Sequence, residues 1–116
     1  MSAIDPAPAV LATDGTLWLA YRIARDPHHC GVVRFHHVVR YAWGAPPATH
    51  VEEVAPELPR GGFYEVPAGS DAPPGARRWL VTFPAAMLDV IAADAEVVMR
   101  AMAAPSPSHA LAALHA

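Results

Sequence analysis

The sequence contains no lysine, one cysteine and few charged residues, and these shortages already exclude several classes of protein. The single cysteine, Cys30, cannot form a disulfide within the chain, which fits a reducing, cytoplasmic compartment. All eight basic residues are arginines and 11 residues are acidic, which gives a net charge of −3. Because a nucleic-acid-binding surface is normally basic, we expect no nucleic-acid partner. No apolar run approaches about 18 residues, so we expect no membrane-spanning helix.

The abundance of alanine and proline, together with the lack of lysine, indicates a GC-rich, bacterial coding bias rather than a functional design. A length of 116 residues allows one domain with one modest core. Residues 1–12 are rich in alanine and proline and have no hydrophobic period, so we expect a disordered N-terminal segment. Residues 1–10 also lack the basic and apolar regions of a signal peptide. A single β-rich domain is expected over 13–103. Residues 104–116 are expected to form a flexible tail or one weak helical turn.

Two runs in which apolar and polar residues alternate predict a β-hairpin in the first half of the chain. The first run covers residues 16–24, after a turn signal at Thr13-Asp14-Gly15, and the second covers residues 32–43. Their apolar faces coincide only when the numbers of paired residues add up to an even value, for example with Tyr21 opposite Phe35. A slip by one residue would turn Arg34 toward the core, so the pattern itself defines the register.

The second half of the chain predicts two more strands, over 63–66 and 77–83, after a long connection at 44–62 that is rich in proline and glycine. A connection of that length is either a packed irregular loop or a functional one. Residues 84–103 fit two structures. Apolar residues at steps of three and four favour an amphipathic helix, whereas residues 86–92 could equally form a strand that returns along 78–83.

Four short segments resemble a loosely defined group of small bacterial proteins of unknown function. The segments are Tyr41-Ala42-Trp43-Gly44-Ala45-Pro46, Phe63-Tyr64-Glu65-Val66, Arg78-Trp79-Leu80-Val81-Thr82-Phe83 and Leu88-Asp89-Val90-Ile91-Ala92. The chain departs from the group at Pro84-Ala85, where the group has a His-Asp turn. The resemblance covers most of residues 16–98 and implies that residues 86–92 are a return strand. It implies no established function.

We therefore predict a mainly β fold, α+β at most, built as a single twisted antiparallel sheet or half-barrel. At most one short helix is expected near the C-terminus, at 94–103, where a short strand is the alternative. Because so small a sheet needs cover on its second face, we expect a homodimer. The predicted core consists of Tyr21, Ile23, Val33, Phe35, Val39, Tyr41, Trp79, Val81 and Phe83.

Histidine is the one enriched polar residue type, with seven copies, and it suggests a metal site. His28, His29 and Cys30 lie in a predicted loop and could supply ligands to a transition metal, with His36 or His50 as a third. No spacing typical of a known metal motif supports this site. The alternative is that these side chains have ordinary structural roles and that the protein has no cofactor.

Residues for catalysis are few. Cys30 beside His29 could form a nucleophile and base, but no third residue is placed to orient them. Serines occur only at the two ends and in one loop, and the acidic cluster of Glu52, Glu53 and Glu57 lies in the long connection, where solvation is the ordinary state. The sequence therefore favours a non-enzymatic role.

A tryptophan among arginines marks a candidate partner-binding surface on the polar face of the hairpin. Its residues are Trp18, Arg22, Arg34, His36 and Arg40. Tryptophan and arginine dominate interaction hot spots, so an acidic protein partner would fit this surface. The alternative is that the face packs against a second layer of the fold, which buries Trp18 and leaves only the arginine heads in water.

Three functions remain open. The first is a protein-interaction module, of the immunity-protein type that neutralises a toxin, which binds one protein partner or a second copy. The second is a histidine-based metal-binding protein or small metal-dependent enzyme. The third is a small-ligand binder that uses the cavity of a curved sheet, with residues 44–62 as its lid.

Overall fold

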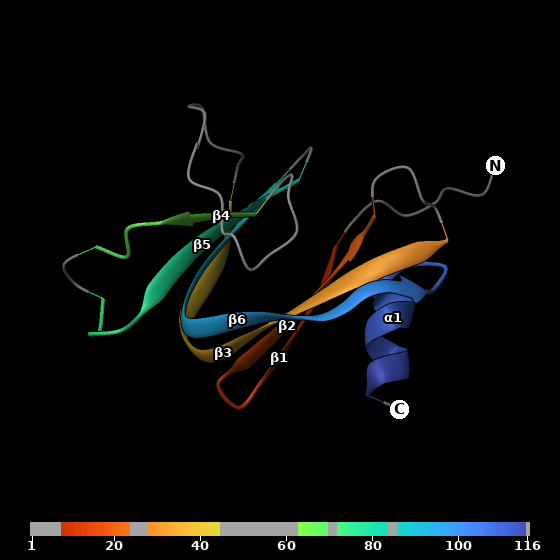
Figure 1. Ribbon diagram of the computed structural model, residues 1–116, viewed down its shortest axis with the longest axis horizontal. Coiled ribbons are helices and arrows are strands. Elements are labelled where there is room, and N and C mark those ends of the chain that lie inside the picture. The colour runs from red at the N-terminus through yellow and green to blue at the C-terminus, as the bar shows by residue number, and fades with distance from the viewer. Residues whose placement is uncertain (1–7, 24–27, 45–62, 70–71, 84–85, 116) are drawn as a thin grey trace. The chain divides into compact units, whose positions relative to one another are not determined.

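The computed structural model describes residues 8–23, 28–44, 63–69, 72–83 and 86–115. Among them are six strands and one helix: β1 (Ala9–Thr13), β2 (Thr16–Arg22), β3 (His29–Gly44), β4 (Phe63–Val66), β5 (Arg77–Thr82), β6 (Met87–Ala103) and α1 (Pro107–Leu114). The strands form one antiparallel sheet in the order β1-β2-β3-β6-β5-β4 (Figure 1). The predicted mainly β fold with a short C-terminal helix is therefore confirmed. Within the described residues, no helix is long and apolar enough to cross a membrane.

The chain divides into two compact units, where the sequence predicted one domain over 13–103. The first unit comprises residues 1–34 and 96–116, and the second comprises residues 35–95. The two longest strands, β3 and β6, contribute residues to both units. The first unit also contains β1, β2 and α1, whereas the second contains β4 and β5.

Two hairpins build the strands of the first unit. Asp14 and Gly15 connect β1 to β2, and the positive φ of Gly15, 74°, suits a tight two-residue turn. The amide of Ile23 donates to the carbonyl of His29 at 3.3 Å where β2 leads into β3. The predicted even-numbered parity of this hairpin is thus correct, but Tyr21 lies over Gly31 rather than opposite Phe35. Residues 9–12 form most of β1, although the sequence predicted a disordered segment there.

Helix α1 lies in the segment for which the sequence predicted either a flexible tail or one weak helical turn. Ser106 caps it by accepting a hydrogen bond from the amide of His109 at 3.2 Å, and Pro107 occupies the first turn, where its missing N–H costs nothing. The helix packs against β1 and β2. Beneath it is a small core of buried residues, namely Ala20, Cys30, Val32, Ala104, Ala110 and Leu111. Pro107, one of the two prolines that suggested a tail, therefore belongs to the first turn of a helix.

In the second unit, β5 pairs with β4 on one side and with β6 on the other. The return strand predicted over 86–92 is confirmed, because Arg77–Thr82 pair residue by residue with Met87–Ala92. The helix predicted near 94–103 is wrong, since β6 continues as a strand to Ala103. Buried side chains of this unit include Phe35, Phe63, Trp79, Val81, Leu88 and Val90. Phe35 and Trp79 contact each other with ring centroids 5.5 Å apart.

The predicted core is partly correct. Val33, Phe35, Trp79 and Val81 are buried, and Tyr21, Ile23 and Phe83 are half-buried. Val39 and Tyr41 are instead exposed, with 49% and 41% of their surface accessible. Burial ends at His37, whose φ of 53° is left-handed. Every residue from Val39 to Gly44 is exposed, so neither face of the strand is covered there.

Candidate functional site

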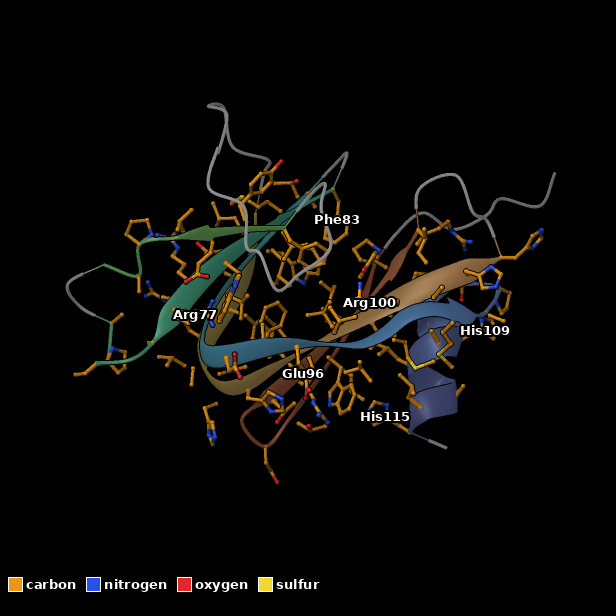
Figure 2. All side chains as sticks on the ribbon, in the orientation of Figure 1. Arg77, Phe83, Glu96, Arg100, His109 and His115 are labelled. Carbon is orange, nitrogen blue, oxygen red and sulfur yellow. The ribbon has the colours of Figure 1, made fainter. Side chains whose placement is uncertain are left out.

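Trp18 and Arg34, two residues of the predicted partner surface, are already bound to other groups of the first unit. The Arg34 guanidinium lies 4.8 Å from the centroid of the Trp18 ring, a cation–π geometry. Arg34 also forms an ion pair with Glu96, to which its Nε donates at 2.7 Å. On the helix side, the His115 ring contacts Trp18 edge-on at 4.6 Å. Figure 2 labels Glu96 and His115, the outer members of this stack.

Arg22, His36 and Arg40 complete the predicted surface. Arg22 donates to the carbonyl of Pro105 at 2.7 Å, which holds the chain just before α1. His36 and Arg40 belong to the second unit, whereas Trp18, Arg22 and Arg34 belong to the first. In the first unit, the alternative of a face that packs against a second layer therefore describes these residues better than a free binding surface does.

The metal candidates do not converge in the described part of the chain. Cys30 is fully buried in the core beneath α1. Burial raises the pKa of its thiol, and the positive charge of Arg22 opposes this effect only partly. His29 and Cys30 belong to β3 and not to the predicted loop, and the carbonyl of His28 just before them accepts from the amide of Ala104 at 3.0 Å. Within the described residues, no three His, Cys, Asp or Glu side chains are grouped to hold a metal ion.

The burial of Cys30 also bears on the predicted Cys–His pair for catalysis. A thiol that is buried and has a raised pKa is a poor nucleophile, because the reactive form is the thiolate. Cys30 therefore gains no support as the nucleophile of a Cys–His pair. The third ligand His50 and the acidic cluster of Glu52, Glu53 and Glu57 lie outside the described residues, as does nearly all of the predicted lid over 44–62.

Arginine–carboxylate pairs connect the strands of the second unit, and the sequence analysis missed them. Arg77 donates to both carboxylate oxygens of Glu65, at 2.9 and 2.5 Å, and lies 3.5 Å from Asp94. Arg78 forms a second two-point pair with Asp89, at 2.9 and 2.6 Å. Each pair joins neighbouring strands diagonally, so it becomes visible only once the register is known. We interpret these partly exposed ion pairs as structural links between neighbouring strands.

Trp79 lies at the centre of the same unit with one polar group unsatisfied. Its indole N–H is buried and has no hydrogen-bond partner among the residues that the structure describes. Arg77 lies over the ring, 4.9 Å from its centroid (labelled in Figure 2). An orphaned buried donor costs about 1–3 kcal/mol, so Trp79 contributes to this core through its area rather than through hydrogen bonding.

The C-terminal half of β3, residues 37–44, carries an exposed surface that includes two residues of the predicted core, Val39 and Tyr41. We call this segment the exposed strand. Val39, Tyr41 and Trp43 occupy alternate positions, and therefore one face, and expose 49%, 41% and 41% of their surface. Trp43 contacts Phe83, with ring centroids 5.9 Å apart. The alternation was visible in the sequence, but alternation alone does not tell whether the apolar face is covered.

The main chain of the exposed strand also has an open side. Strand β2 has seven residues and β3 has 16, and the two are joined at the Ile23–His29 end. Residues 37–44 therefore extend past the end of β2. In the second unit the strand order is β3-β6-β5-β4, so β3 is an edge strand there. On the outer side of residues 37–44, no other strand of the second unit among the described residues continues the ladder of hydrogen bonds.

No protein-family model, curated protein sequence or solved structure matches this chain. The resemblance to a group of small bacterial proteins therefore stays a prediction. Function has to be inferred from the geometry of the described residues, and the exposed strand is the feature there that most calls for a partner.

Proposed function

We propose that this chain is a non-enzymatic protein-interaction module that binds an extended segment of a partner along the exposed strand. The observation that carries this proposal is the combination of an open main-chain edge with three exposed large apolar side chains, Val39, Tyr41 and Trp43. In strand addition, main-chain hydrogen bonds supply affinity and the alternate side chains supply specificity. Aromatic residues are enriched at such contacts because they bury a large area with few rotatable bonds.

The chemistry of the exposed strand defines the class of partner. Arg40 is its one Arg, Lys, Asp or Glu residue, and it lies between Val39 and Tyr41 on the opposite face. The fitting partner segment is extended, places apolar side chains toward Tyr41 and Trp43, and puts no positive charge opposite Arg40. Of the surface predicted from the sequence, only Arg40 belongs to this binding element. The module is immunity-protein-like in one sense: it acts by occupying its partner and performs no reaction.

Site-specific photo-crosslinking in the native cell tests this function. A photoreactive amino acid replaces Tyr41 in one variant and the exposed Ala112 of α1 in a matched control. We expect a discrete adduct, with another protein or with a second copy, from position 41 and none from position 112. Equal labelling from both positions, or no adduct from position 41, would contradict the proposal.

A further inference from the structure

We infer that the exposed strand pairs with the same strand of a second copy, which gives a two-fold dimer with a continuous sheet. This inference rests on the proposed function, because it identifies one occupant of the same edge. Two identical edges related by a two-fold axis run antiparallel and present the same groups to each other. The donors and acceptors on the outer edge of residues 37–44, which pair with no strand of the second unit among the described residues, are therefore complementary to those of a second copy.

The side chains select one register. When Tyr41 lies on the two-fold axis, it faces Tyr41 of the other copy, and Val39 faces Trp43 in both directions. The three exposed large apolar side chains then meet on one face. On the other face Arg40 meets Ala42, so no like charges lie opposite each other.

Neighbouring registers are less favourable. An axis on Arg40 would place two guanidinium groups directly opposite each other, which is destabilising in a cross-strand pair. An axis on Ala42 would pair Val39 with residue 45, beyond the end of the strand at Gly44. The register with Tyr41 on the axis is therefore the one that both pairs the apolar side chains and separates the charges.

The exposed area indicates a weak, exchangeable dimer. A buried aromatic side chain covers about 150–250 Å², so the exposed two-fifths of Tyr41 and of Trp43 offer roughly 60–100 Å² each. Over both copies these aromatic side chains offer roughly 240–400 Å². Even with Val39 and the main chain, the total stays below the roughly 1,200–2,000 Å² typical of stable complexes. Pairing would nevertheless cap an apolar sheet edge, which otherwise invites open-ended aggregation.

Disulfide trapping tests the register. Both variants carry Cys30→Ala, which removes the native thiol, and one adds Tyr41→Cys while the matched control adds Arg40→Cys. Directly opposite residues of an antiparallel pair lie about 4.5–5.5 Å apart between Cα atoms, within disulfide range, whereas Arg40 and its copy are two residues out of register. We expect a reducible dimer under mild oxidation from position 41 and at least tenfold less from position 40. Equal or preferential trapping at position 40 would overturn the inference.

Sedimentation of the unmodified chain separates this inference from the proposed function. We expect a monomer–dimer equilibrium that shifts with concentration, and at least a tenfold weaker association for Tyr41→Lys, with an unchanged unfolding transition. A chain that stays monomeric at the highest concentration overturns the dimer. In that case a photo-adduct of position 41 with another protein would still support the proposed function, and its absence would contradict both.

Discussion

The two parts of β3 have similar side chains but different surroundings. Before His37, the strand contains Cys30, Val32, Val33 and Phe35, and all four are fully buried. After it, Val39, Tyr41 and Trp43 are the exposed large apolar residues. Cys30 and Val32 are covered by α1, and Phe35 packs on Trp79, whereas residues 37–44 extend past the short strand β2. The comparison teaches that in this strand the neighbours, and not hydrophobicity, decide which part forms core and which part remains open to a partner.

The largest contrast is expected from truncating one aromatic side chain in each part of β3. Phe35→Ala removes a fully buried ring that contacts Trp79 and should lower the free energy of unfolding by about 3–5 kcal/mol. Tyr41→Ala at an exposed position should change it by less than about 0.5 kcal/mol but weaken association through the edge. Urea denaturation at low protein concentration measures the first effect and sedimentation the second. A large loss of stability from Tyr41→Ala would show that position 41 belongs to the core after all.

The same small substitution at two glycines sharpens the contrast. At Gly31 an added methyl group would overlap the Tyr21 ring, and such overpacking costs about 1–3 kcal/mol or more. At Gly44 nothing described lies within 4 Å of that position, so Gly44→Ala should be neutral or slightly stabilising. Chemical denaturation of both variants checks this. Gly31→Ala should lower the free energy of unfolding by less in a Tyr21→Ala background than in the wild type. An equal loss in both backgrounds would argue against the contact.

His37 separates the two parts of the strand, and its backbone can be tested directly. A β-branched residue is strained at a φ of 53°, so His37→Val should destabilise the chain by about 1–2 kcal/mol. Glycine adopts this conformation without strain, so His37→Gly should be tolerated or slightly stabilising. Thermal unfolding of the two variants gives the comparison. Equal stabilities would indicate that residue 37 is not held in the left-handed region.

The smallest expected effect is a pH dependence in the first unit. Burial raises the pKa of Tyr21 to about 12, and Arg100 opposes the shift. Because the pKa in the folded state exceeds the unfolded value of about 10, the unfolded chain loses this proton first. The contribution of Tyr21 to stability is thus complete below pH 10 and declines as the pH rises toward 12. Denaturation across this range should show a steeper decline for the wild type than for Tyr21→Phe, and parallel curves would contradict the assignment.

The sequence by itself determined where most strands lie. The period of two over 16–24, 32–43, 63–66 and 77–83 is a local property of the chain, since successive side chains of a strand point to opposite faces. The parity of the first hairpin followed from the same pattern. The small core beneath α1 did not follow from the sequence. A serine followed by a proline, such as Ser106-Pro107, occurs in flexible tails as well as at helix starts.

Only the tertiary structure decided that β6 continues to Ala103 and that the exposed strand is open to a partner. Alanine, glutamate and methionine over 94–103 favour a helix locally, yet β6 continues there beside β3 because strand pairing outweighs weak propensity. Val39, Tyr41 and Trp43 were visible as an apolar face, but the alternation did not show that residues 39–44 are exposed on both faces. Alternation predicts that a face is apolar. Whether that face is covered depends on which elements reach it, and this is a property of the folded chain.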